Sequence, residues 1–336
     1  DLIHLHLKLK KNTMNFFFTI ALLFAGLTLA HAQDGKVHGK IFSNFNYSVN
    51  DEATAFGITR AYFGYKYQYS DDWSAKLTLD FGGAETYART AYLKVAALQW
   101  KVTDKLTVNF GQVGLKQFNT QEKNWGYRYI QKSAQDAYKM GASADMGLTA
   151  DYKLNDMVSV DLTMVNGEGY KKNQTDVNMK KGFGLTLKPA DGLTIRAYMD
   201  MMGAEDVVET VDSVSTTIEK PTQNTTALFV GYNTDDFRLG AEYNMQTAHG
   251  NVEGADYDIL SAYGTYYLKD NVGVFARYDM VSCDEGGHDS KNGDYMIAGL
   301  EYRPVKGVSV SANLQGFTPE EGGAENSIFM NLQYKF

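Results

Sequence analysis

Apolar and polar residues alternate with a period of two along most of the chain. In residues 73–81, five apolar side chains from Trp73 to Phe81 alternate with four polar ones, and the same pattern recurs at 61–69, 158–164, 193–201, 237–245 and 308–314. Successive side chains of a β-strand point to opposite faces, so this pattern predicts strands with one apolar and one polar face. Helical spacing fits none of these segments well.

Sixteen segments of this kind follow one another from residue 36 to the end of the chain. They cover 36–49, 54–69, 73–82, 88–100, 105–113, 139–153, 157–166, 181–188, 192–203, 224–233, 236–247, 257–268, 271–281, 293–303, 307–317 and 326–336.

The connections between these segments alternate between tight and long. Most tight ones carry the Asp, Asn or Gly that turns require, as in 70–72, 103–104, 155–156 and 190–192. The long ones are 83–87, 114–138, 167–180, 204–223, 248–256, 282–292 and 318–325, and all four prolines lie in connections or at strand ends. The connections at one end of the structure are therefore expected to be short, and those at the other end long.

An even number of strands with this asymmetry predicts a closed antiparallel transmembrane β-barrel of the outer-membrane type, with short periplasmic turns and long outer loops. A sheet in a membrane must close, because an open edge would leave backbone groups unpaired in hydrocarbon. A soluble β-sandwich shows the same alternation, and the pattern of connections favours the barrel over it.

The first 32 residues predict a cleavable signal peptide. Residues 16–30 form an apolar run too short to span a bilayer as a helix, and Ala30-His31-Ala32 is a small-x-small cleavage pattern. Either Met14 is the true start or translation begins before residue 1. Cleavage after Ala32 leaves residues 33–336 as a single exported barrel domain.

Composition and charge exclude several classes of protein. The chain is 44% apolar and 13% aromatic, with 32 Gly, 4 Pro and one cysteine, which excludes collagen-like, disordered and disulfide-scaffold proteins. The net charge is −8, and losing residues 1–32 removes three lysines and one aspartate, which leaves −10. So acidic a chain is not expected to bind nucleic acid. Cys283 has no second cysteine to pair with.

The last segment carries a resemblance to a known family. Ile328, Met330, Leu332, Tyr334 and Phe336 alternate and end on an aromatic residue at the C-terminus. With the exported, alternating chain, this ending resembles the bacterial trimeric porins, and among them the phosphate-selective porin O and P-like group with sixteen-stranded barrels. The resemblance covers most of residues 33–336 as architecture. It implies that Tyr334 and Phe336 are read by the barrel-assembly machinery, that the protein is a homotrimer, and that outer-membrane lipids and lipopolysaccharide surround it.

The polar face of each strand is expected to line the lumen. The charged residues out of phase with the apolar ones are Arg60, Lys66, Lys76, Lys94, Lys105, Lys188, Arg196, Arg238, Arg277, Arg303 and Lys335, against Asp80, Asp145, Asp151, Asp161, Asp200, Glu242, Asp279 and Glu301. Lys94 lies in a strand of ambiguous phase. The cations outnumber the anions, so the wall is predicted to be mildly basic while the acidic residues gather in loops and turns. Alternatively, these charges simply neutralise one another across a wet lumen.

The longest internal connection, 114–138, follows the fifth strand, where family porins fold a loop into the barrel. Its cations are Lys116, Lys123, Arg128 and Lys132, and it is rich in aromatic residues. We expect a basic constriction loop, or alternatively an outer loop packed on the rim. The segment lacks the Pro-Glu-Phe-Gly-Gly pattern of general porins, and the chain lacks the dense arginine ladder expected for high phosphate selectivity.

No motif in the exported chain indicates an enzyme, a metal site or a cofactor. His38, His249 and His288 lack metal-ligand spacing, and no nucleophile elbow, Walker loop or dinucleotide fingerprint occurs. Acidic residues in 205–219 and 284–289 suit divalent cations that bridge to lipopolysaccharide, or are only solvated loop surface. The sequence thus predicts a porin for passive diffusion of small hydrophilic solutes with a weak anion preference. The alternatives are an adhesin barrel with a plugged lumen and a barrel hydrolase.

Overall fold

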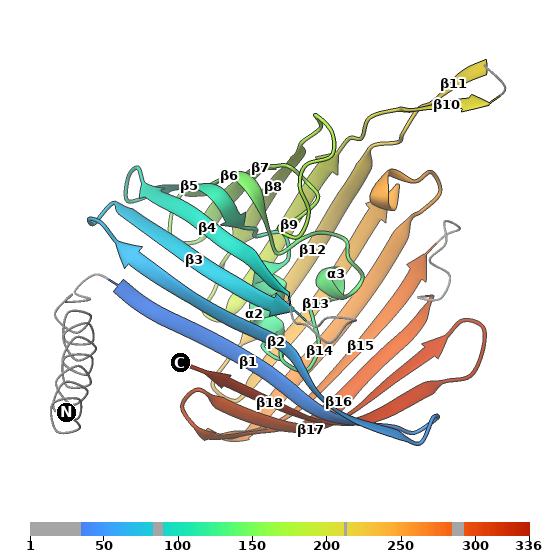
Figure 1. Cartoon of the computed structure of the whole chain (residues 1–336). Helices are drawn as coiled ribbons and strands as arrows, with labels where there is room; N and C mark the ends of the chain where they lie inside the picture. The colour runs from blue at the N-terminus through green and yellow to red at the C-terminus, as the bar shows by residue number, and fades with distance from the viewer. Residues whose placement is uncertain (1–34, 83–89, 212–213, 284–291) are drawn as a thin grey trace, which may run out of the picture. The chain divides into compact units, whose positions relative to one another are not determined.

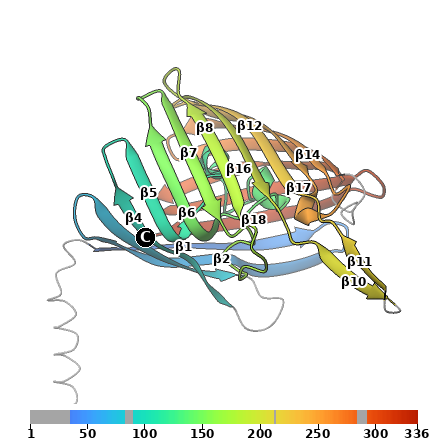
Figure 2. The same cartoon turned by 90° about the horizontal axis from the view of Figure 1, so that it is seen from above.

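Sixteen antiparallel strands pair edge to edge into a closed barrel (Figures 1 and 2). The computed structural model describes residues 35–82, 90–211, 214–283 and 292–336. The barrel strands are β1 (Gly35–Ser48), β2 (Ala53–Gln68), β3 (Trp73–Gly82), β4 (Ala91–Lys101), β5 (Leu106–Gly114), β6 (Ala144–Lys153), β7 (Val158–Val165), β8 (Lys180–Leu187), β9 (Leu193–Met202), β12 (Gln223–Asn233), β13 (Phe237–Thr247), β14 (Tyr257–Lys269), β15 (Val272–Cys283), β16 (Gly293–Val305), β17 (Val308–Pro319) and β18 (Glu325–Lys335).

The sixteen-stranded barrel predicted from the alternation is confirmed, and most strand ends fall within a few residues of the expected ones. The sixth strand begins at Ala144 rather than at residue 139, because residues 139–143 still belong to the preceding connection. A hairpin that was not predicted, β10 (Val207–Val211) with β11 (Val214–Ile218), forms a separate two-stranded sheet that projects from the long-loop end (Figure 2). The signal peptide prediction lies outside the described residues.

The barrel closes where its first and last strands pair. Lys40 lies opposite Lys335 and Ser48 opposite Ser327, with an unbroken register between them. The terminal residue extends this seam, because the backbone N–H of Gly39 donates to the carbonyl of Phe336 at 2.9 Å and the N–H of Phe336 donates back at 3.1 Å. The last residue of the chain thus takes part in closure.

The two faces of the wall differ as the alternation predicts. Large apolar side chains such as Phe110, Leu228 and Met330 are exposed on the outside. Trp73 and Trp100 stack there with ring centroids 5.2 Å apart. The inward positions carry polar side chains, and those not covered by loops face an open lumen. None of the helices in the described residues is long and apolar enough to cross a bilayer.

Candidate functional site

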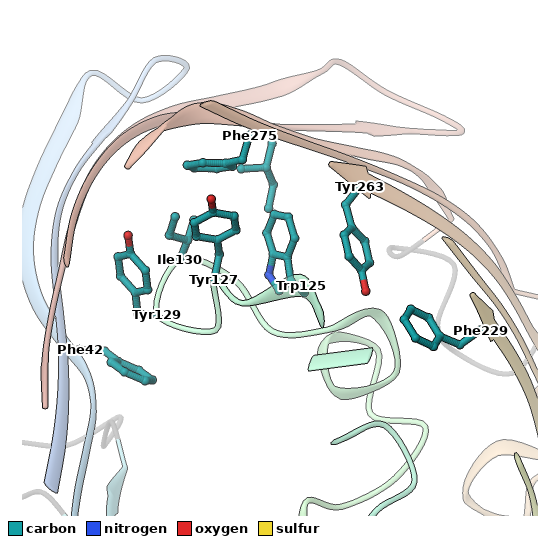
Figure 3. Close-up of a cluster of buried hydrophobic side chains, with 9 residues drawn as sticks. Phe42, Trp125, Tyr127, Tyr129, Ile130, Phe229, Tyr263 and Phe275 are labelled. Carbon is teal, nitrogen blue, oxygen red and sulfur yellow. The ribbon is translucent and has the colours of Figure 1, made fainter. Parts of the chain in front are cut away.

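The connection between β5 and β6 folds into the barrel and packs against its inner wall. It contains α2 (Asn119–Trp125) and α3 (Ala134–Ala137), both of which lie inside the ring of strands (Figure 1). Its aromatic side chains join inward-facing residues of distant strands in one buried cluster, which comprises Phe42, Trp125, Tyr127, Tyr129, Ile130, Phe229, Tyr263, Phe275 and Ile297 (Figure 3). We call residues 115–143 the first infolded loop. Of the two alternatives for this segment, the loop inside the lumen is the one observed.

Three arginines of the wall hold the backbone of this loop. Arg196 donates to the carbonyl of Lys116 at 3.1 Å, Arg238 to that of Trp125 at 2.8 Å, and Arg277 to that of Lys132 at 2.5 Å. Charged donors make strong hydrogen bonds, so the loop is fixed at three points, one near its start and two in its middle part.

Arg238 reaches the loop only because Gly126 ends α2. Gly126 has φ 76°, a left-handed conformation that favours glycine, and a Cβ there would lie 2.3 Å from a guanidinium nitrogen of Arg238. The sequence Trp-Gly-Tyr at 125–127 therefore fixes both the end of the helix and the contact with the wall.

Two of the three arginines are neutralised by carboxylates of the same wall. Arg196 lies 2.6 Å from Asp161, and Arg277 lies 2.6 Å from Asp279. A buried charge needs such a partner, since an isolated one would be strongly destabilising. These pairs therefore contribute little net charge to the lumen.

Nine of the charged residues predicted to line the pore are at inward positions of the strand register and differ in exposure: Arg60, Lys66, Lys76, Asp80, Arg196, Arg238, Glu242, Arg277 and Arg303. Asp80, Arg196, Glu242 and Arg277 are at most 2% exposed. This differs from the expectation that they would face open water, because alternation gives the direction of a side chain and not what covers it. Arg60 pairs with Asp80 at 3.0 Å, Arg303 lies 3.6 Å from Glu301, and Arg238 is bound to the first infolded loop. Lys66 and Lys76 stay exposed.

The four cations predicted for the constriction loop differ in whether they form ion pairs with carboxylates. Arg128 bridges Glu122 and Asp136 at 3.0 and 3.1 Å, and Lys132 also pairs with Asp136. Lys116 pairs with Asp151 of β6. Within the described part of the chain, Lys123 alone of the four forms no ion pair. The count of loop charges therefore overstates their effect on a passing ion.

The wall nearest the seam carries lysines that are not paired with carboxylates of the described residues. Lys66 and Lys76 are direct cross-strand partners, and so are Lys40 and Lys335. Like charges directly opposite one another destabilise a sheet. None of these four residues forms an ion pair with the described residues, and neither does Lys123 of the first infolded loop. We call Lys40, Lys66, Lys76, Lys123 and Lys335 the lysine strip. Lys40 was not among the residues predicted to line the lumen.

A second loop, between β7 and β8, also reaches inward. Asp145 accepts the backbone N–H groups of Gly167 and Gly169 at 2.7 and 3.1 Å, which bends residues 166–170 over the lumen. The Tyr170 hydroxyl then donates to Asp80 of β3 at 2.5 Å. Burial and this hydrogen bond raise the pKa of Tyr170, which keeps the phenol a donor. We call residues 166–179 the second infolded loop. Sequence reasoning missed it, because a contact 90 residues away leaves no local pattern.

Cavities lie on both sides of the first infolded loop. One of 630 Å³ is lined by turn residues such as Asp104 and Asn155, together with Lys116, Lys123 and Arg196, and lies toward the short turns. The other, also of 630 Å³, is lined by both infolded loops and lies toward the long-loop mouth. Each is large enough for a small solute. In the part of the chain that the structure describes, no group of three or more His, Cys, Asp or Glu side chains could hold a metal.

Solved structures of outer-membrane proteins share this architecture. OmpF of Salmonella typhi, solved in a complex with daunomycin, aligns with a TM-score of 0.67 and 15% identity over 90% of this chain and 97% of that one. OmpT of Vibrio cholerae aligns with a TM-score of 0.61 and 17% identity over 90% and 97% of the two chains. A mutant of Rh. blastica porin aligns with a TM-score of 0.58 and 15% identity over 90% and 100%.

The chain has the fold of a porin-like barrel. At these identities the likeness establishes the fold, and function must be argued from the lumen. Comparisons with protein-family models and with curated proteins find no match. The porin-like barrel is thus recognised by its strands and infolded loop rather than by a sequence motif.

Proposed function

We propose that this porin-like barrel is an outer-membrane channel for passive diffusion of small hydrophilic solutes, with a weak preference for anions. The cavities on both sides of the first infolded loop support a wet path past the constriction. The aromatic cluster holds the loop against the wall from β12 to β16 and at Phe42 of β1, so the loop narrows the lumen between the two cavities.

The anion preference rests on the lysine strip. The arginines of the wall, and the other cations of the first infolded loop, are mostly paired with carboxylates or bound to loop carbonyls. The electric fields of these cations are therefore largely cancelled. Selectivity is set by charges close to the ion, because the Debye length is about 8 Å at physiological salt. The exposed lysine pairs therefore outweigh the acidic residues of the outer loops, although the whole chain is acidic.

A non-enzymatic role is part of the same proposal. A barrel hydrolase needs a carboxylate or another group free to act on substrate. Four buried carboxylates are within 3.0 Å of an arginine or lysine nitrogen: Asp80, Asp161, Asp200 and Asp279. Two others are held by hydrogen bonds, since Asp145 accepts from the backbone of Gly167 and Gly169 and Glu242 accepts from Asn244 at 3.1 Å. An adhesin with a plugged lumen is disfavoured by the two cavities.

The remaining elements of the proposal concern location and assembly. Contact with lipids and lipopolysaccharide is supported by the apolar outer face and its exposed tryptophans. Export by a signal peptide rests on the apolar run and the cleavage pattern in residues 16–32. A homotrimer is supported by likeness to OmpT of Vibrio cholerae, which was also solved in a trimer form. The finer resemblance to the phosphate-selective group is supported only by the lysine strip.

The test is the reversal potential of the purified protein in a planar bilayer under a KCl gradient. We expect chloride selectivity in the native channel. Replacing Lys66→Gln together with Lys76→Gln should move the reversal potential toward K⁺, while Lys306→Gln in an exposed short turn should leave it unchanged.

Two results would contradict the proposal. Absence of conductance from folded protein would refute the channel itself. A cation-selective native channel, or a double variant that behaves as wild type, would refute the role of the lysine strip.

A further inference from the structure

A β-bulge in β4 directs Lys94 into the lumen. Thr78 of β3 pairs with Val95 and Leu79 pairs with Leu93, so Lys94 has no partner on β3. Bulges re-aim side chains and are frequent beside functional sites. The Lys94 ammonium lies 3.5 Å from the Tyr62 hydroxyl, 4.8 Å from the centre of the Tyr62 ring and 5.2 Å from that of Tyr170.

This ammonium lacks a carboxylate partner among the described residues. The ion pairs formed by cations of the surrounding cavity belong to Arg60, Arg128, Lys132 and Lys180. Taking an unpaired charge out of water is costly, and two tyrosine rings compensate for only part of that cost. The position therefore favours an anion that enters from solution.

The second infolded loop brings another lysine to the same place. Lys171 Nζ lies 4.8 Å from the Tyr92 ring, and Arg60 and Lys171 approach the same point, 3.5 and 3.8 Å from where a Cβ on Gly82 would lie. Partial burial, followed by the charge of Arg60, lowers the pKa of Lys171. The missing side chain at Gly82 leaves room between these two cations.

The cavity that these residues enclose has an excess of unpaired cations. Eight lysines and arginines line its 630 Å³, and four of them form no ion pair with the described residues: Lys94, Lys139, Lys171 and Lys172. The cavity lies toward the long-loop mouth. A solute arriving from that side meets this cavity before it reaches the lysine strip.

We propose that Lys94 and Lys171 form a binding subsite for the oxyanion group of a small solute, a carboxylate or a phosphate, at the long-loop entrance. The subsite rests on the proposed channel function and adds a saturable binding step to it. Bulk anion selectivity needs only a net positive field. A subsite needs two ammonium groups around one small space. The bulge and the second infolded loop bring both to the Tyr170 ring, with Lys94 Nζ 5.2 Å and Lys171 Nζ 5.9 Å from its centre.

Calorimetric titration of the folded full-length protein in detergent tests the subsite without relying on conductance. Inorganic phosphate and gluconate are titrated separately, so that the two sources of an oxyanion are distinguished. We expect saturable binding of one or both, and a Kd raised about tenfold by Lys94→Met, which removes one charge-assisted contact. Lys94→Arg should retain most of the binding.

Lys171→Gln is the second variant, because a substitution at this exposed loop position should not disturb folding. Like Lys94→Met, it should raise the Kd for the anion. Lys306→Gln, far from this cavity in sequence and in a short turn, is the matched control and should bind as wild type. Absence of saturable binding of both anions would overturn the subsite, as would unchanged binding in both Lys94→Met and Lys171→Gln. A protein that binds but does not conduct would refute the channel and leave the subsite supported.

Discussion

Several charged residues of the barrel wall act as hydrogen-bond donors to the loop rather than as charges that face solvent. Arg277 shows this most clearly, because it is buried, donates to Asp279 through Nε at 2.8 Å and Nη2 at 2.6 Å, and also reaches the backbone of Lys132. Its guanidinium lies 5.2 Å from the Trp125 ring. The planar, multidentate donor set of arginine suits such a site better than lysine would.

We predict that Arg277→Met destabilises the folded barrel by about 3–5 kcal/mol, because Asp279 is left as a buried, uncompensated carboxylate. The temperature at which the folded form is lost on unboiled gels measures the effect. Combining it with Asp279→Leu should recover much of the loss. Arg303→Met is the control and should cost under about 1 kcal/mol, because the Arg303 side chain is partly exposed, its contact with Glu301 is long at 3.6 Å, and Glu301 keeps the hydrogen bond from Tyr129. Equal effects of the two single variants would contradict this account.

At the scale of elements, the sequence predicts strands well and loops poorly. Alternation is a local signal, so the strands and their inward faces follow from it, including Lys66 and Asp80. The paths of both infolded loops depend on contacts such as Tyr170 with Asp80 that no local pattern encodes. The resemblance to porins anticipated the first of these loops, and nothing in the sequence indicated the second. The bulge that orients Lys94 could not be predicted from the sequence either, because it is defined only by the register of β4 with β3.

Trp125 anchors the first infolded loop, and we predict that Trp125→Ala enlarges the channel. The side chain is 1% exposed, packs against Tyr263 and Phe275, and donates its indole N–H to the carbonyl of Gln131 at 2.9 Å. Its truncation should remove about 3–5 kcal/mol of packing and loosen the loop. Single-channel conductance should rise or fluctuate between levels.

Trp100→Ala is the matched control for that variant. Trp100 stacks on Trp73 on the outer face, so its loss should change contacts with detergent or lipid and leave conductance as in wild type. An unchanged conductance in Trp125→Ala would mean that the loop keeps its place without this anchor.

At the scale of the whole molecule, the barrel depends on closing one seam. The alternation and the turn pattern predicted sixteen strands, and a closed sheet then requires β1 to meet β18. The part that the terminal residue plays in closing the barrel could not be predicted from the sequence. A Cβ on Gly39 would lie 2.3 Å from the ring of Phe336, so the absence of a side chain at residue 39 makes room for the final aromatic group.

We predict that deleting Phe336, or Phe336→Asp, lowers the amount of folded barrel in the membrane while synthesis stays constant. Gly39→Val should act in the same direction by displacing the ring. Membrane fractions compared on unboiled gels give the measurement, with Glu325→Gln at the other end of β18 as the control. Wild-type levels in all three seam variants would show that the terminal contact is dispensable.

Tyr129 of the first infolded loop connects strands on both sides of that seam. Its ring lies 6.4 Å from that of Phe42 on β1, its hydroxyl donates to Glu301 on β16 at 3.0 Å, and its carbonyl accepts from Asn331 on β18 at 3.4 Å. These partners are separated from it by up to 202 residues of chain. Contacts so distant in sequence form late and slowly. The loop therefore links the first strand to the last strands from inside the barrel. We expect barrel closure and the packing of this loop against the inner wall to be one cooperative event in assembly.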